Sequence, residues 1–160
     1  MTRAFVALGG NLGDTHAQLR RALDALAGLP HTRLLAQSRF FRTPPWGLRE
    51  QPPFLNAAAM LDTGLAPHEL LDALLTIEQA AGRVRNGERW GPRTLDLDLL
   101  HMDGVLMHDD RLTLPHPRIA ERAFVLLPLA ELAPDLELPG QGRVDVLLAA
   151  IDTTGCDPLL

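Results

Sequence analysis

Length, composition and charge are those of a globular chain, and they exclude several classes of protein. Of the 160 residues, 46% are hydrophobic and 22% are charged, and the net charge of -5 argues against a general nucleic-acid binder. All fifteen basic residues are arginine, which excludes a lysine-dependent phosphate loop and a Schiff-base enzyme. The single cysteine, Cys156, cannot form an internal disulfide. The apolar run near the N-terminus is short and ends at glycines, so we expect neither a signal peptide nor a membrane span, and a cytoplasmic location.

Hydrophobic spacing predicts five elements in the first half of the chain. Leu19, Leu23 and Leu26 recur at helical spacing, and Thr15 with Gln18 has the spacing of a capping box. The predicted elements are a strand at 3–9, a helix at about 14–27, strands at 32–42 and 54–62, and a helix that starts at Pro67 and stops at Gly82.

The second half is predicted to add one core strand and an extension. The predicted elements are a strand at 95–102, a hairpin or extended segment at 104–114, a short helix within 119–132 and a helix at 144–151 in a weakly patterned tail. The order is strand, helix, strand, strand, helix, strand. It predicts an α+β fold, in which a ferredoxin-like βαββαβ antiparallel sheet carries two helices on one face and a C-terminal extension follows, as a single domain over residues 1–160.

Asp96 and Asp98 alternate with leucines in the last of these strands. Because alternate side chains of a strand share a face, the two carboxylates are expected on one face, with their Cβ atoms roughly 6–7 Å apart. Like charges this close disfavour each other unless a positive charge lies between them, and oxygen ligands on a rigid strand suit Mg²⁺. On the alternation alone, an ordinary polar outer face is an equally good interpretation.

A polar loop before this strand favours the metal interpretation. Residues 83–93 contain four arginines and one glutamate, a local excess of positive charge in an acidic chain. Arginine binds phosphate oxygens through its planar guanidinium group. Acidic metal ligands beside such a loop predict an enzyme that acts on a nucleoside triphosphate with magnesium. The alternative is a solvated loop paired with surface acids.

Other residues remain ambiguous from their pattern. The glycines in segment 9–13 lie between a strand and a helix, and we prefer a plain turn to a phosphate-binding loop because the spacing and the lysine of such loops are absent. His116 could donate a hydrogen bond to phosphate or have no role. Phe54 and Phe124 could stack on a flat heterocycle, although phenylalanine is more often a core residue. Asn56, on the same strand face as Phe54, could bind the edge of such a ring.

Taken together, several motifs make the sequence similar to a known enzyme family. The motifs are Gly9-x-Asn11-Leu12-Gly13, Arg42-Thr43-Pro44-Pro45-x-Gly47, Phe54-Leu55-Asn56-Ala57, Gly82-Arg83-x-Arg85, the run from Arg89 to Asp98, and Leu114-Pro115-His116. They resemble those of the 6-hydroxymethyl-7,8-dihydropterin pyrophosphokinases of folate biosynthesis, and the resemblance extends over about residues 3–139.

The resemblance implies a reaction and a set of site residues. ATP gives its β,γ-pyrophosphoryl group to the hydroxymethyl oxygen of the pterin and leaves as AMP, with two Mg²⁺ ions bound by Asp96 and Asp98 and with Arg83 and Arg93 also catalytic. The residues implied around ATP are Glu78, Arg83, Trp90, Arg93, Leu99, Arg111, Thr113, His116 and Arg122. The residues implied around the pterin are Thr43, Pro44, Trp46, Phe54, Asn56 and Phe124.

The resemblance also implies that the loops 43–53 and 83–93 close over the substrates. We expect a monomer that binds neither nucleic acid nor membrane. Asn86 stands where family members commonly carry lysine, and Phe54 and Pro117 stand where tyrosines are common. Two rival interpretations of the residues are a metal-dependent phosphohydrolase that uses the same aspartates on water, and a ferredoxin-like regulatory module that binds a ligand without catalysis.

Overall fold

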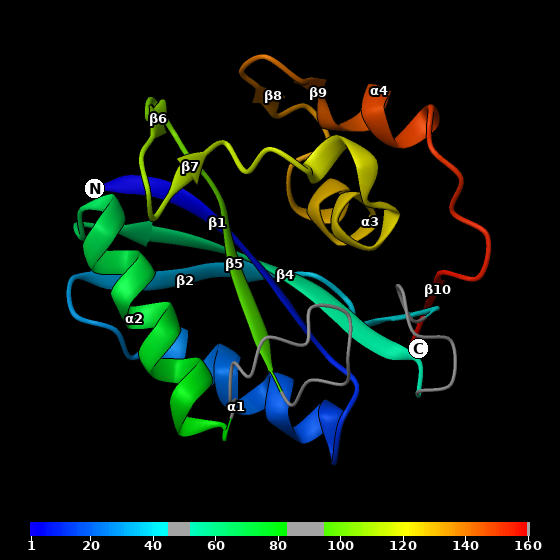
Figure 1. Cartoon of the computed structure of the whole chain (residues 1–160), viewed down its shortest axis with the longest axis horizontal. Coiled ribbons are helices and arrows are strands. Elements are labelled where there is room, and N and C mark those ends of the chain that lie inside the picture. The colour runs from blue at the N-terminus through cyan, green and yellow to red at the C-terminus, as the bar shows by residue number, and fades with distance from the viewer. Residues whose placement is uncertain (45–51, 83–94, 160) are drawn as a thin grey trace.

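The main feature of the fold is an antiparallel sheet with β4 and β1 as its long inner strands (Figure 1). The computed structural model describes residues 1–44, 52–82 and 95–159. The strands of the sheet are β1 (Thr2–Gly10), β2 (Thr32–Gln37), β3 (Phe41–Thr43), β4 (Phe54–Thr63), β5 (Asp96–Met102) and β10 (Asp157–Pro158). Their order is β10-β3-β4-β1-β5, and β2 also pairs with β4. Every pair is antiparallel, so the ferredoxin-like prediction is confirmed.

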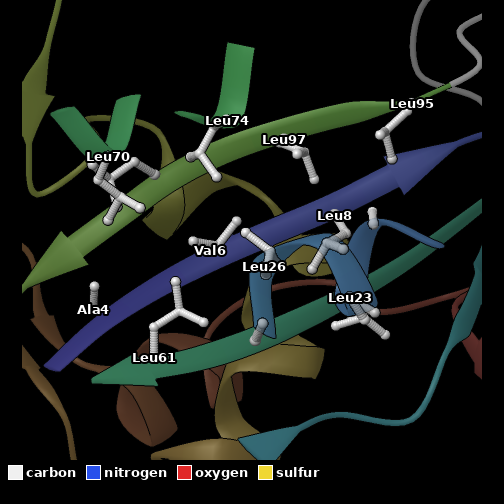
Figure 2. Packing of buried hydrophobic residues seen from close by; sticks show 14 of the residues in the cluster. Ala4, Val6, Leu8, Leu23, Leu26, Leu61, Leu70, Leu74, Leu95 and Leu97 are labelled. Atoms are coloured by element: carbon white, nitrogen blue, oxygen red, sulfur yellow. The ribbon is translucent and has the colours of Figure 1, made fainter. Parts of the chain in front are cut away.

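Two helices cover one face of the sheet. They are α1 (Thr15–Ala27) and α2 (Pro67–Ala80), and their leucines pack on the leucines of β1, β4 and β5, as Figure 2 shows. Leu26 from α1 and Leu74 from α2 are almost fully buried beside Val6 and Leu97 of the sheet. The helical spacing in the sequence therefore predicts this layer correctly.

The C-terminal extension covers part of the other face. The 3-10 turn η1 (Ile119–Glu121) leads into α3 (Ala123–Leu132), which packs against β4, and α4 (Val144–Ala149) packs on α3. A second buried cluster joins Phe5 and Leu100 of the sheet to Leu126 of α3 and Val144 of α4. On β1 this cluster includes Phe5 and Ala7 but ends before Gly9, so the far end of this face has no apolar cover from α3.

Two hairpins flank this layer. They are β6 (Met107–His108) with β7 (Thr113–Leu114), and β8 (Glu137–Leu138) with β9 (Gly142–Arg143). The first confirms the hairpin predicted at 104–114, and the second lies in the tail, for which the sequence predicts only a helix. None of the described helices has the length and apolar character needed to cross a membrane.

The single strand predicted at 32–42 is two strands, β2 and β3. The break falls at Ser38, where the hydroxyl accepts a hydrogen bond from the backbone N–H of Ala58 at 2.8 Å and donates one to the carbonyl of Arg39 at 2.8 Å. A serine side chain thus replaces a rung of the backbone ladder. Glu131 of α3 accepts from the N–H of Arg39 at 2.9 Å and fixes the break to the helix layer.

The cap of α1 also differs from the predicted capping box. Asp14, not Thr15, is the N-cap residue, and its carboxylate accepts a hydrogen bond from the N–H of Ala17 at 3.2 Å. The hydroxyl of Thr15 is directed to the carbonyl of Gly13 at 3.4 Å. Aspartate is as good an N-cap as threonine, so residue type alone does not choose between neighbouring candidates.

This cap predicts the stability of two variants. Asp14→Ala should lower the free energy of unfolding by about 1 kcal/mol, because the first turn of α1 loses its side-chain acceptor. Thr15→Ala should change it by a few tenths of that, since its hydroxyl does not cap the helix. Urea unfolding followed by circular dichroism measures both, and equal losses in the two variants would contradict the assignment of the cap.

Candidate active site

A row of opposed residues across three strands forms the centre of the candidate site. The register places Asp96 of β5 opposite Gly9 of β1, and Gly9 opposite Asn56 of β4. Directly opposed residues of antiparallel strands project from the same face. Asp96 and Asn56 therefore share a face on either side of β1, about 10 Å apart at two strand spacings. This is the face that carries α3, at its end beyond the apolar cluster.

Asp98 joins this face two residues along β5. Asp96 and Asp98 are both partly exposed, whereas the alternating residues Leu95, Leu97 and Leu99 are buried on the opposite face against α1 and α2. The alternation therefore separates the acids from the core as the sequence predicts. In the described part of the chain, no group of three or more histidine, cysteine or acidic side chains is arranged to hold a metal ion.

Gly9 leaves the middle of the row without a side chain. A Cβ atom on Gly9 would lie 2.4 Å from Oδ1 of Asn56, closer than real Cβ contacts come. The Asn56 amide thus lies against the backbone of β1, and its Nδ2 donates a hydrogen bond to the hydroxyl of the buried Thr43 at 2.6 Å. Glycine within a strand often marks such a close approach.

Asn11 fixes the beginning of the neighbouring strand. Its side chain is 3% exposed, and Nδ2 donates a hydrogen bond to the carbonyl of Pro52 at 2.9 Å. The contact joins the turn after β1 to the residues that lead into Phe54 and Asn56 of β4. The segment 9–13 is therefore more than a plain turn, because it determines where β4 starts.

His116 is a neutral ring within the electrostatic influence of Asp96. Burial and the charge of Arg122 lower the pKa of His116 from 6.5 to about 4, against the opposing charge of Asp96. Its Nδ1 accepts a hydrogen bond from the backbone N–H of Arg118 at 3.2 Å, so the proton of the neutral ring lies on Nε2. At neutral pH the ring can therefore donate one hydrogen bond from Nε2.

Arg122 interacts electrostatically with both acids. Burial lowers the pKa of its guanidinium group, and the charges of Asp98 and Asp96 oppose that shift. Arginine remains protonated at any physiological pH despite such a shift. Its guanidinium carbon lies 5.7 Å from the ring centroid of Phe124, which belongs to the first turn of α3. Arg122 thus joins the acidic pair to the aromatic side of the site.

Three further residues expected around ATP, Glu78, Leu99 and Arg111, lie in or against the helix layer on the other side of β5. Glu78 of α2 is 2% exposed and accepts a hydrogen bond from the backbone N–H of Leu97 at 2.7 Å. Leu99 is in the core beside α2. Arg111 forms an ion pair with Asp72 of α2. Among the described strands β5 pairs only with β1, so Glu78 satisfies an N–H on the edge of the sheet, at the residue between the two acids.

Thr113 and the described residues expected around the pterin are divided between four elements. Thr113 of β7 is hydrogen-bonded to His108 of β6 at 2.8 Å. Thr43 and the exposed Pro44 lie at the end of β3, and Phe54 precedes Asn56 by two residues on the same face of β4. Phe124 projects from α3, which packs against β4. Trp46, Arg83, Trp90 and Arg93 lie outside the described residues.

Three residues that organise this site have structural roles that the sequence does not predict. Gly9 and Asn11 belong to one of the family motifs but are predicted only to form a turn, although a glycine inside a strand pattern is itself a signal of close packing. Gln141, described below, lies in a tail with weak periodicity and gives no signal in the sequence. Their roles depend on contacts between residues that are far apart in the chain.

The fold and the site define a ferredoxin-like α+β domain in which a sheet face carries an acidic pair, and a half-buried arginine and a neutral histidine from the segment before α3 interact electrostatically with these acids. The family model of 7,8-dihydro-6-hydroxymethylpterin-pyrophosphokinase matches residues 5–134. The 2-amino-4-hydroxy-6-hydroxymethyldihydropteridine pyrophosphokinase of Methylorubrum extorquens is 51% identical over 157 residues, which cover 98% of both chains. The protein of the same name from Pseudomonas aeruginosa is also 51% identical, over 98% of this chain and 96% of its own. The chain belongs to this family.

Solved structures agree with the fold at low sequence identity. A structure of a Plasmodium falciparum HPPK-DHPS triple mutant superposes with a TM-score of 0.73 at 11% identity and covers 93% of this chain. An HPPK-DHPS solved in complex with substrates gives 0.70 at 12% identity, also over 93% of this chain. In each case the chain spans 43% of the other protein's length, so the likeness concerns one part of a longer chain.

The surroundings of His116 predict its titration. Its ring should titrate near pH 4 in NMR spectra rather than near 6.5, because burial and Arg122 disfavour the charged form. Between these two values the unfolded chain binds the proton more tightly, so the contribution of His116 to stability should be lost as the pH falls from 6.5 towards 4. His116→Gln should remove this part of the pH dependence. A midpoint near 6.5 would contradict the buried, neutral assignment.

Proposed function

We propose that this chain transfers the β,γ-pyrophosphoryl group of ATP to the hydroxymethyl oxygen of 6-hydroxymethyl-7,8-dihydropterin, giving the pterin diphosphate and AMP, as a 2-amino-4-hydroxy-6-hydroxymethyldihydropteridine diphosphokinase. The observation that carries the proposal is the row Asp96, Gly9 and Asn56. It gives one sheet face a buried amide, suited to a heterocycle edge, and an acidic pair, suited to a cation and phosphate, and the amide packs on Gly9 because that residue has no side chain.

The acidic pair fits magnesium by the chemistry of its donors. Two carboxylates on alternate positions of a strand supply hard oxygen ligands, and magnesium in phosphate-binding sites takes few protein ligands and completes its shell with water and phosphate oxygens. We propose that Asp96 and Asp98 hold two Mg²⁺ ions with ATP. Ions bound there would neutralise the negative charge that develops on the phosphoryl oxygens.

The chain's own groups orient the two substrates. Thr43 holds the Asn56 amide through Nδ2, so the amide presents a fixed edge to a pterin ring. We propose that Phe54 and Phe124 stack on the two sides of the ring, with Pro44 and Trp46 at its edge. A site that binds a ring by both hydrogen bonds and stacking can fix the direction of the hydroxymethyl group, and alignment with the attacked phosphorus lowers the barrier.

We propose that Arg122 and His116 bind the triphosphate. The guanidinium group carries a permanent charge beside both acids, and Nε2–H of neutral His116 donates a hydrogen bond without a further charge. We propose that Arg83 and Arg93 bind phosphate as well, and that Glu78, Trp90, Leu99, Arg111 and Thr113 surround the rest of the nucleotide. Fixed donors around a transferring group stabilise its developing charge without reorganisation.

We also propose that residues 1–160 act as one domain, as a monomer in the cytoplasm, where ATP is available. The net charge of -5 supports a function without nucleic acid or a membrane surface, since both usually require a basic patch. The two small-molecule substrates are sufficient partners for the reaction.

Product analysis tests the proposed reaction. With Mg²⁺, ATP and 6-hydroxymethyl-7,8-dihydropterin, the purified chain should release AMP in a one-to-one ratio with a pterin diphosphate, measured by chromatography and phosphorus NMR. ADP as the nucleotide product would refute the pyrophosphoryl transfer. Release of phosphate from ATP at the same rate without the pterin would favour a phosphohydrolase instead.

Variants of the acidic pair form the control for this experiment. Asp96→Ala and Asp98→Ala should each lower kcat by roughly a hundredfold or more, since charge stabilisation at such a site amounts to several kcal/mol. Both side chains are partly exposed, so the thermal unfolding of the variants should stay close to that of the wild type. Unchanged turnover in both variants would refute their assignment as ligands.

The row Asp96, Gly9 and Asn56 predicts the effect of adding a side chain at Gly9. Gly9→Ala should raise the KM for the pterin by about tenfold or more, because the new methyl group displaces the Asn56 amide, and one well-placed hydrogen bond in a closed site is worth about that factor. Steady-state kinetics with each substrate varied in turn measures the change.

Gly28→Ala is a matched control for this substitution. Gly28 ends α1, and a Cβ there would meet its nearest atoms at an ordinary distance of 3.6 Å. Its kinetic constants should equal those of the wild type. A pterin KM that is the same in Gly9→Ala and Gly28→Ala would show that Asn56 does not bind the pterin from this position.

A further inference from the structure

The C-terminal extension reaches the candidate site through one side chain. Gln141 lies in the turn between β8 and β9, beyond the residues 5–134 that match the family model. Its Nε2 donates a hydrogen bond to the carbonyl of His116 at 2.8 Å, and its Oε1 accepts one from the N–H of Ala120 at 3.3 Å. A single amide thus binds a backbone group at each end of the segment from His116 to Ala120.

The segment 116–122 is held from two directions. The N–H of His116 donates to the carbonyl of Leu100 at 2.8 Å, which ties the segment to β5 two residues after Asp98. Gln141 binds the carbonyl of the same His116 from the opposite direction. Arg122 follows at the end of η1, where its N–H donates to the carbonyl of Ile119. A shift of this segment would therefore move both His116 and Arg122 relative to the acids.

The hairpin that carries Gln141 is itself fixed. Leu138 is 1% exposed and Val144 is fully buried, and both pack in the cluster that includes Ile119 of the held segment. The N–H of Val144 donates to the carbonyl of Leu136 at 3.0 Å, and the N–H of Gln141 donates to the carbonyl of Leu138 at 2.9 Å. The amide of Gln141 is therefore presented from a rigid support, which a positioning role requires.

We propose that Gln141 is a positioning residue for the nucleotide side of the site, acting through the backbone of His116 and Ala120 to place His116 and Arg122 opposite Asp96 and Asp98. The expected change in kcat/KM rests on the proposed function, whereas the clamp on the segment 116–122 does not. It assigns the extension a part in the reaction in addition to its part in the fold. Glutamine suits the position because only an amide side chain offers a donor and an acceptor on one rigid plane.

Two substitutions separate the contacts of the amide. Gln141→Leu has a similar size and removes both hydrogen bonds. Gln141→Glu keeps an acceptor for the N–H of Ala120 but has no donor for the carbonyl of His116. Val144→Ala is the matched control, because it weakens the same part of the extension by removing buried volume and touches neither His116 nor Ala120 through a side-chain hydrogen bond.

The kinetic experiment compares the change in kcat/KM for ATP with the change in KM for the pterin. Gln141→Leu should lower kcat/KM for ATP by about tenfold to a hundredfold, because small misplacements of binding groups have effects of that size, and should leave the KM for the pterin within about twofold. Val144→Ala, compared at a temperature where both variants are fully folded, should leave both constants within about twofold. Equal kinetic losses in Gln141→Leu and Val144→Ala would overturn the proposal, since Gln141 would then act only through stability.

Hydrogen exchange gives a readout that needs no turnover. The amide of Ala120 should exchange faster in Gln141→Leu than in the wild type, and Gln141→Glu should keep its protection while losing kcat/KM for ATP. Unchanged exchange at Ala120 in Gln141→Leu would overturn the proposal. If the wild type produced no AMP, the proposed function would fail, while faster exchange at Ala120 in Gln141→Leu would still establish the clamp on the segment 116–122.

Discussion

The site depends on a missing side chain at the centre of the sheet. β1 is the only strand between β4 and β5, so whatever projects from it at Gly9 would stand between the amide of Asn56 and the carboxylate of Asp96. With glycine there, the Asn56 amide packs on the backbone of β1, and both functional groups project from the same face of the sheet. The spacing of the strands determines the separation between Asn56 and Asp96, and the hydrogen bond to Thr43 then fixes the orientation of the Asn56 amide.

The two faces of the sheet have different tasks. Leucines from α1 and α2 bury the face that carries Leu97, and this layer supplies most of the core. On the opposite face the apolar cluster with α3 and α4 includes Phe5 and Ala7 of β1, and the polar side chains of Asn56, Asp96 and Asp98 lie towards the other end of the strands. Glu78 connects the two faces, because its carboxylate comes from α2 on the core side and accepts a hydrogen bond from the N–H of Leu97, between the two acids of β5. Rigid support from the core thus reaches the groups on the open face.

The sequence predicts those parts of this arrangement that depend on local spacing. Helical and alternating periods place α1, α2 and the two faces of β5, because burial of leucines decides both. Asp14, Ser38 and Gln141 could not be found in this way. Each acts through hydrogen bonds to backbone groups, and several polar residues near each position could have served equally well by type. The pairing of Asn56 with Gly9 required the register, which no local pattern gives.

The outermost strand, β10, has a consequence for how the molecule meets its neighbours. It pairs with β3 through Asp157 and Pro158, and the N–H of Leu159 donates to the carbonyl of Phe40 at 2.8 Å. Proline has no N–H to offer to a further strand, and aspartate adds a charge at the rim. The side of the sheet nearest Thr43 therefore ends in a segment that discourages edge-to-edge association between copies, and β3 is shielded from intermolecular pairing.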